Sequence, residues 1–294
     1  MILSFSGGRI EITGIRSAAE QRHALAAAER VLPFQQKESG SHAIWRIELC
    51  VSNRSHIEDF PGQRRTVIQS CFELTEHEWR RLLRATCQRV LIVCGLFGLH
   101  AVVASLDDKL VAITGTYGTG KTSVGEVLFA QGAKLLSSDY TVIGWQGAEA
   151  KAMVIGGTRP TLSRAQAEGV DTSASGRYLT GMTSLIDTSE VLTAIVYLES
   201  NQRGKHFAHE EHPEVSRRTL TDLYLNASTG FDQVLERFHF PLSILNSSAD
   251  QMVRFTLVER LVAQVQVTRA RGNSQFLADL ISGVANASKL CPQA

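Results

Sequence analysis

The chain has 294 residues, of which 44% are hydrophobic and 20% charged, a composition typical of a globular protein with a sizeable core. Thirty basic residues stand against 29 acidic ones, and the net charge of +1 gives no overall basic field for a nucleic-acid backbone, so we expect no nucleic-acid partner. The five cysteines are scattered and form no C-x-x-C pair, which favours a reduced, cytoplasmic protein.

Residues 1–75 predict a small α+β region without recognisable ligand chemistry. Two alternating apolar segments flank Gly7-Gly8 and predict a hairpin. Ser17 is expected to cap a helix that ends before Pro33. Further strands are expected over residues 44–51 and 66–74, with a polar loop between them. The first residues lack the basic and long apolar stretches of a signal peptide.

A helix is expected from residue 75 to about residue 97, where Thr75 and Glu78 form a capping box. We place the start of a second domain, residues 76–294, at this helix. Apolar residues at helical spacing form one face, and Arg80, Arg81 and Arg84 lie away from it. These arginines are interpreted as a solvated face, with contact to an anionic partner as the alternative.

The most apolar stretch, residues 90–106, is interpreted as a helix end and a core strand, because a membrane span needs about 20 apolar residues. We therefore expect no membrane partner. A hairpin follows, with strands over residues 99–106 and 109–114 and a turn at Asp107-Asp108.

The second strand of this hairpin leads into the pattern G-x-x-x-x-G-K-T and then into a helix-compatible run. Glycines let the backbone turn tightly and direct its N–H groups at a polyphosphate, and the helix adds its positive end. Lys121 supplies a charge for the phosphates, and Thr122 supplies a hydroxyl ligand for Mg²⁺. The pattern predicts that the chain binds ATP and Mg²⁺. The nucleotide-binding residues are expected to be Gly115, Thr116, Tyr117, Gly118, Thr119, Gly120, Lys121, Thr122 and Ser123.

Beyond this motif, an apolar strand carries Asp139 at its carboxyl end. Residues 146–192 are rich in Gly, Ser and Thr and indicate a substrate loop, in which Arg159 is a candidate contact for the transferred phosphoryl group. A buried strand is expected over residues 192–199, and helices over 218–238, 249–271 and 274–290. His206, His209 and His212 recur every third residue; we interpret them as an exposed turn, with a metal site as the alternative.

The order of these segments resembles the HPr kinase/phosphorylase-type P-loop kinases, which include kinases that act on peptides or on free serine. The similar residues are Leu99-His100-Ala101-Val102, the spacing to GTYGTGKTS, and LFAQGAKLLSSDYTVI after it. LTAIVYLES and FHFPLSIL are similar to later strands of the family. The likeness spans residues 85–145 and continues in patches to residue 247.

The resemblance implies an α/β fold whose P-loop core has a mixed central sheet and flanking helices, preceded here by the small α+β region. It implies that His100 lies close to the phosphates and that an acidic pair follows the next strand. That pair reads Ser138-Asp139 here, so one carboxylate is absent. If Asp139 and Thr122 hold Mg²⁺, His100 is the nearest candidate for the general base. The glycine-rich signature of full HPr kinases is not recognisable, so HPr itself is not the expected substrate.

The sequence thus predicts a kinase that moves the γ-phosphate of ATP to a hydroxyl acceptor, with Lys121, Asp139, His100 and Arg159 as its catalytic residues. The acceptor is open between a serine-type residue of a protein or peptide and a small hydroxylated metabolite. The resemblance is also compatible with a homo-oligomer. Two alternatives are an ATP-binding regulatory module whose chemistry has decayed and an enzyme similar to the phosphoenolpyruvate carboxykinases.

Overall fold

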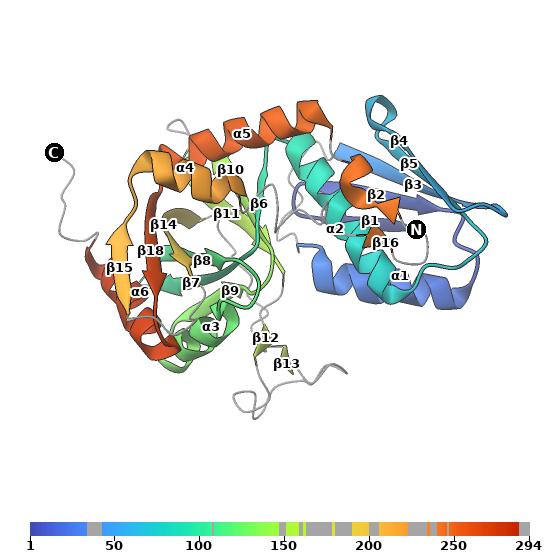
Figure 1. Cartoon of the computed structure of the whole chain (residues 1–294). Coiled ribbons are helices and arrows are strands. Elements are labelled where there is room, and N and C mark those ends of the chain that lie inside the picture. The colour runs from blue at the N-terminus through green and yellow to red at the C-terminus, as the bar shows by residue number, and fades with distance from the viewer. Residues whose placement is uncertain are drawn as a thin grey trace.

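The structure, a computed structural model, describes residues 1–33, 43–107, 109–146, 151–158, 161–162, 178–179, 190–199, 206–222, 234–235, 240–245 and 247–287. In these residues two large mixed sheets are flanked by helices, as the predicted α/β class requires. Figure 1 shows the two sheets side by side, with the first sheet toward the right.

The first sheet has the strand order β1-β2-β3-β5-β4. Its strands are β1 (Ile2–Phe5), β2 (Gly8–Thr13), β3 (Ala43–Val51), β4 (His56–Phe60) and β5 (Arg65–Ser70). The hairpin at Gly7-Gly8 is confirmed, since β1 and β2 pair antiparallel with Phe5 opposite Gly8. The expected loop before Pro61 is wrong, because β4 lies there. Edge pairing with β5 stabilises this segment although few of its side chains are apolar.

Helices α1 (Ala18–Val31) and α2 (Glu76–Val93) share one core with this sheet. Ser17 caps α1 by accepting the Glu20 N–H, and Thr75 and Glu78 form the predicted capping box of α2. The predicted end of α2 near residue 97 is too late, because Gly95 adopts a left-handed conformation (φ +68°) that terminates the helix. The division after residue 75 stays a prediction, although α2 packs against α1, β2 and β3.

The second sheet contains nine strands in the described residues, seven of them in the order β6-β10-β11-β14-β8-β7-β9, and β18 joins β15 to β14. Its strands are β6 (Phe97–Leu99), β7 (Ala101–Leu106), β8 (Lys109–Gly115), β9 (Lys134–Ser137), β10 (Thr141–Gln146), β11 (Lys151–Gly157), β14 (Glu190–Leu198), β15 (Phe207–Glu210) and β18 (Gln266–Arg271). The pairs β8–β14 and β14–β18 are parallel. Strands β8 and β9 also run in the same direction, because both pair antiparallel with β7.

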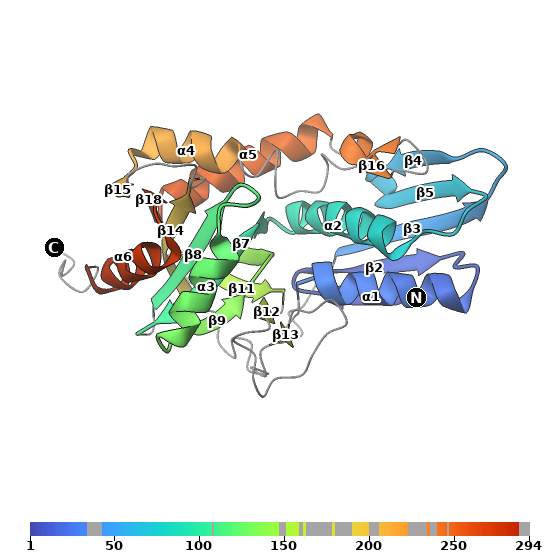
Figure 2. The same cartoon turned by 60° about the horizontal axis from the view of Figure 1, so that its bottom comes forward.

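Helices cover both faces of the second sheet. Apolar residues of α3 (Lys121–Ala130) and α6 (Ser274–Ala287) form one core with one face, and those of α4 (Pro213–Asp222) and α5 (Ser248–Val262) form another core with the opposite face. Figures 1 and 2 show α5 extending from the second sheet toward the first. The long helix expected over residues 249–271 is wrong, because the segment contains α5 and then the central strand β18.

The chain returns to the first core after α4. The expected helix over 218–238 ends with α4 at Asp222 in the described residues, and short strands β16 (Val234–Leu235) and β17 (Phe240–Pro241) precede a 3₁₀ turn, η5 (Leu242–Leu245). The leucines of this segment are fully buried in the first core: Leu235, Leu242 and Leu245. The remaining short elements are η1 (Pro61–Gln63), β12 (Thr161–Leu162) and β13 (Tyr178–Leu179).

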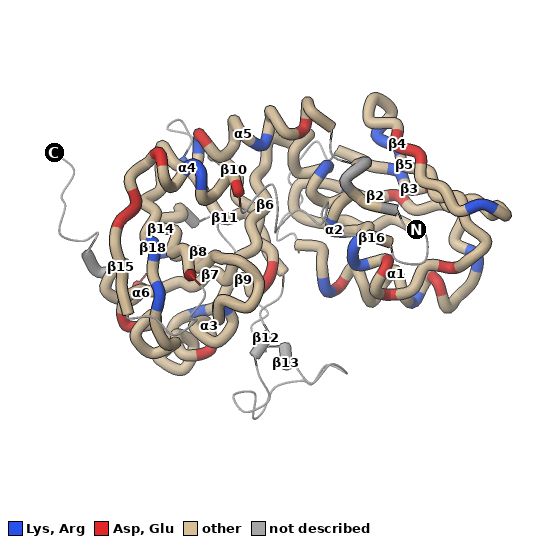
Figure 3. Tube along the Cα trace, in the orientation of Figure 1, with Lys and Arg blue, Asp and Glu red and all other residues tan. Residues whose placement is uncertain are grey.

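Basic and acidic residues are interspersed along the described trace, in keeping with the nearly zero net charge (Figure 3). None of the helices in the described segments combines the length and apolarity that crossing a bilayer requires.

Candidate functional site

The strand, loop and helix expected around the glycine-rich motif are present in the structure. β8 ends at Gly115, α3 begins at Lys121, and the residues between them form a tight loop. Gly115 has a φ of +150°, and a Cβ atom there would lie 2.5 Å from the Leu198 carbonyl oxygen. Conformation and space both require glycine at this position. Gly120 occupies the N-cap of α3 without a side chain, so the first N–H groups of the helix are left for another acceptor.

Lys121 is the charged centre of this loop. Its side chain is almost fully buried, and its Nζ donates hydrogen bonds to the carbonyl oxygens of Gly115 (3.0 Å) and Thr116 (2.9 Å). Burial lowers the pKa of Lys121 to about 8, while the negative charge of Asp139 acts in the opposite direction. A partner with more negative charge would therefore be needed to hold the ammonium fully protonated at neutral pH.

The other residues of the loop differ in exposure. Thr119 is buried and donates to the Thr116 carbonyl oxygen (2.9 Å), and Thr122 is partly exposed in the first turn of α3. Tyr117 is 95% exposed at the tip of the loop. Its ring is therefore open to a molecule that approaches the loop from solvent.

His100 and Asp139 lie together next to this loop. His100 stands between β6 and β7, and Asp139 stands between β9 and β10. His100 Nδ1 is 3.4 Å from Asp139 Oδ1. The carbonyl oxygen of His100 accepts a hydrogen bond from the Thr114 hydroxyl (3.0 Å), and the Thr158 hydroxyl oxygen accepts one from the Asp139 N–H (3.1 Å). The backbone of both residues is thus anchored to neighbouring strands.

Three charged groups surround the His100 ring. Burial lowers the pKa of His100 to about 4, Asp139 raises it, and Lys121 and Arg84 lower it further. His100 is therefore a neutral imidazole at neutral pH, able to accept a proton but only as a weak base.

Asp139 carries the negative charge of the site. Burial acts to raise its pKa, but Arg84, His100 and Lys121 together outweigh burial and lower the pKa below its ordinary value. The carboxylate is thus ionised, and its side chain is 39% exposed. An ionised and accessible carboxylate at this place can bind a cation or accept a proton.

Arg84 forms an ion pair with Asp139, with Nη2 against Oδ2. The interpretation of Arg80, Arg81 and Arg84 as a solvated face is therefore wrong for Arg84, whose side chain is only 23% exposed. Arg80 and Arg81 are also half-buried, and Arg80 pairs with Glu76 at 3.2 Å within the helix. Periodicity separated these arginines from the apolar face but could not indicate the carboxylate that one of them meets.

The structure brings together four of the side chains named above: Arg84, His100, Lys121 and Asp139. Thr158 is a further residue that the motif analysis missed, although it directly precedes Arg159 in the sequence. Arg159 lies outside the described residues. The roles assigned to all these residues stay predictions.

Thr122 and Asp139 would have to hold the Mg²⁺ ion that the motif implies. Hydroxyl and ionised carboxylate oxygens are the donors that Mg²⁺ prefers, so this pair fits the ion chemically. The part of the chain that the structure describes holds no group of three His, Cys, Asp or Glu side chains arranged for a metal. The remaining ligands would therefore come from phosphate oxygens and water.

The histidine-rich segment is not arranged as the sequence suggested. Its first half forms β15, which pairs antiparallel with β18, so the expected turn is wrong there, whereas the expected exposure of the three histidines is confirmed. His206 stacks on Phe276 with ring centroids 4.7 Å apart, and His212 Nδ1 accepts the Glu214 N–H at 3.3 Å. These side chains have separate partners.

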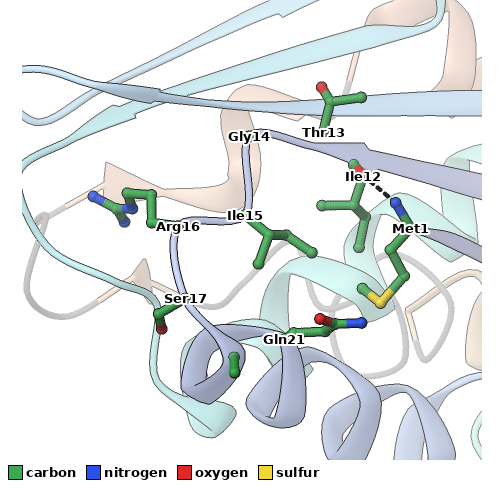
Figure 4. A pocket seen from close by; sticks show the side chains of 9 residues that line it. Met1, Ile12, Thr13, Gly14, Ile15, Arg16, Ser17 and Gln21 are labelled. Carbon is green, nitrogen blue, oxygen red and sulfur yellow. Dashed lines mark hydrogen bonds between the residues drawn. The ribbon is translucent and has the colours of Figure 1, made fainter.

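A cavity of ≈ 610 Å³ opens elsewhere, in the N-terminal part (Figure 4). It is lined by the end of β2, the following turn and the start of α1. Its polar groups bond within the protein: the Met1 ammonium donates to the Ile12 carbonyl oxygen (2.7 Å), and Arg16 pairs with Glu20 (3.3 Å). Because the charged groups of this cavity already have partners within the protein, we place the candidate site at the glycine-rich loop.

No family model and no curated protein matches the chain. Among solved structures, the Hpr(Ser) kinase/phosphatase from Coxiella burnetii is similar over 66% of this chain and 96% of its own chain, with 12% sequence identity and a TM-score of 0.30.

Proposed function

We propose that the chain is an ATP-dependent phosphotransferase that moves the γ-phosphoryl group to a hydroxyl acceptor. The observation that supports this proposal most is the position of Lys121: a buried ammonium at a glycine-rich turn between a strand and a helix, beside an ionised carboxylate and a neutral histidine.

In this proposal residues 115–123 bind the triphosphate. The backbone N–H groups of the loop and of the first turn of α3 donate hydrogen bonds to the phosphate oxygens, and Lys121 neutralises the charge of these oxygens. The two carbonyl oxygens that Lys121 contacts hold its ammonium against the loop, so the charge is already in place before the nucleotide arrives.

Thr122 and Asp139 would hold Mg²⁺, which when bound would supply neutralisation of the negative phosphate charge. Phosphoryl transfer depends chiefly on positioning and charge neutralisation. We therefore assign the largest contribution to Lys121 and Asp139.

His100 is the proposed acceptor of the proton from the attacking hydroxyl. General bases work best when their pKa is close to the working pH, and the pKa of His100, about 4, lies far below neutral pH. Because the transition state of phosphoryl transfer is loose, little proton transfer is needed before the phosphorus is attacked. We therefore assign His100 a smaller share of the rate than Lys121, and Arg159 stays a candidate contact for the phosphoryl group.

The experiment is a transfer assay with γ-labelled ATP and fractionated cell extract, which follows the label into protein, peptide and small-molecule pools. The wild-type chain should transfer label, and Lys121→Ala and Asp139→Asn should not, while circular dichroism shows that both variants are folded. A folded Asp139→Asn variant with wild-type transfer would contradict the assignment.

A regulatory nucleotide-binding module is the second candidate, and the single acid at Ser138-Asp139 favours it. Such a module would bind ATP tightly without transfer to any fraction. The carboxykinase alternative predicts ATP-dependent decarboxylation of oxaloacetate, which a direct assay decides.

A further inference from the structure

Helix α2 reaches from the first core to the acidic residue of the candidate site. Trp79, Leu82 and Leu83 are completely buried among the residues of the first core. Arg84, on the same helix, instead forms an ion pair with Asp139 in the turn between β9 and β10, and Gln88, one turn further along, lies beside Gly98 of β6. One helix thus belongs to the first core and contacts the site of the second sheet.

The contact at Gln88 is close. A Cβ atom on Gly98 of β6 would lie 1.9 Å from the Tyr140 hydroxyl oxygen and 2.6 Å from Gln88 Oε1. Only a glycine lets α2 and the ring of Tyr140 come this near to β6. The end of the Gln88 side chain and the ring of Tyr140 are thus both packed closely against Gly98.

The turn that carries Asp139 is fixed by further hydrogen bonds. The Thr158 hydroxyl oxygen accepts the N–H groups of Asp139 (3.1 Å) and Tyr140 (2.9 Å), and the Ser137 hydroxyl donates to the Tyr140 carbonyl oxygen (3.0 Å). These bonds fix the backbone of the turn but leave the carboxylate of Asp139 free to rotate about its side-chain bonds. The carboxylate itself has two neighbours in the described residues, the Arg84 guanidinium and the His100 ring, and Arg84 is the one that forms an ion pair with it while His100 is neutral.

The two carboxylate oxygens have different neighbours. Oδ2 accepts from Arg84, and Oδ1 is directed at His100 Nδ1, 3.4 Å away. We propose that Arg84 is a positioning residue: by holding Oδ2 it fixes the orientation of the carboxylate and leaves Oδ1, on the side of His100, available to the cation that Asp139 would bind together with the nucleotide. This inference depends on the proposed function, and through α2 it makes the first core a determinant of metal binding.

Charge and geometry make opposite predictions for the loss of Arg84. A cation next to Asp139 repels a divalent ion, so electrostatics alone predicts that removing Arg84 strengthens metal binding. Positioning predicts that removal weakens it, because the loss of a partner that orients a ligand typically costs about 10–100-fold in metal affinity. The sign of the change in metal affinity therefore distinguishes the electrostatic explanation from the positioning role.

The experiment measures Mn²⁺ binding in the presence of a non-hydrolysable ATP analogue, by the electron paramagnetic resonance signal of the free ion. The variants are Arg84→Ala and, as the matched control on the same helix, Arg80→Ala, whose side chain is also half-buried and pairs with Glu76. We expect Arg84→Ala to weaken Mn²⁺ binding by about 10–100-fold and Arg80→Ala to leave it unchanged. If Arg84→Ala does not fold, Arg84→Leu, which keeps side-chain volume but neither charge nor donor, takes its place with the same expected direction.

A second comparison asks whether Arg84 acts through Asp139. In an Asp139→Asn background, adding Arg84→Ala should weaken Mn²⁺ binding no further, because coupled residues are not additive. A further loss of Mn²⁺ affinity in that background means that Arg84 acts on the bound ion or nucleotide without Asp139, and it overturns the positioning role. Equal or tighter Mn²⁺ binding by Arg84→Ala alone also overturns it. A wild-type chain that takes up neither the analogue nor Mn²⁺ contradicts the proposed function instead.

Discussion

If Lys121 contacts the phosphates as proposed, its lowered pKa predicts that nucleotide affinity depends on pH near 8. Free Lys121 has a pKa of about 8, so it is about 91% protonated at pH 7 and about 9% at pH 9. Bound phosphates would raise the pKa of the ammonium, so binding above pH 8 has to take up a proton. Affinity should therefore fall as the pH rises through 8, by about tenfold between pH 7 and pH 9, or about 1.4 kcal/mol.

The assay is displacement of a fluorescent, non-hydrolysable ATP analogue at constant Mg²⁺ over this pH range. His100, with a pKa of about 4, and Asp139, with a lowered pKa, keep their charge states throughout, and a terminal phosphate is largely ionised by pH 7. Lys121→Ala, the matched control, should bind more weakly and without the decline. A wild-type affinity that stays constant from pH 7 to pH 9 would refute the reasoning, because Lys121 would then not be the group that meets the phosphates.

Three further predictions concern the loop and its neighbours. Gly115→Ala should lower the melting temperature and abolish the shift that an ATP analogue gives, because its Cβ would lie 2.5 Å from the Leu198 oxygen; a variant with wild-type melting and shift contradicts this. Thr158→Val leaves two backbone N–H groups without their acceptor, including that of Asp139, so urea titration should show a loss of about 1–3 kcal/mol in unfolding free energy, against no loss if water replaces the hydroxyl. His100→Ala should slow phosphate transfer by less than tenfold, as expected of a weak base; complete loss of transfer in a folded His100→Ala variant would assign it a larger role.

The sequence predicted the strand, glycine-rich loop and helix because their determinants are local. The motif and its flanking apolar residues fall within a short run, and the glycines needed for the left-handed backbone are part of the pattern itself. The capping box of α2 and the Gly7-Gly8 hairpin were likewise found from neighbouring residues. His100 and Asp139, by contrast, were selected through resemblance and not through a local pattern.

Contacts between distant segments could not be predicted. Arg84 and Asp139 are 55 positions apart, and a polar residue on a helix has the same periodicity whether it faces water or a carboxylate. The strand β18 was assigned to a helix because its alternation is short and follows a true helix directly. Its pairing with β14 and β15 on either side decides its conformation, and those partners lie far away in the sequence.

The return of residues 235–245 to the first core has a consequence for any attempt to divide the chain. Leu235, Leu242 and Leu245 lie about 150 residues beyond α2 in sequence, yet are completely buried beside it. A fragment cut between the two sheets would expose these leucines to solvent and would leave a cavity in the first core. The first core thus depends on residues that follow the second sheet's helix α4 in the chain. Either part expressed without the other should therefore aggregate rather than fold.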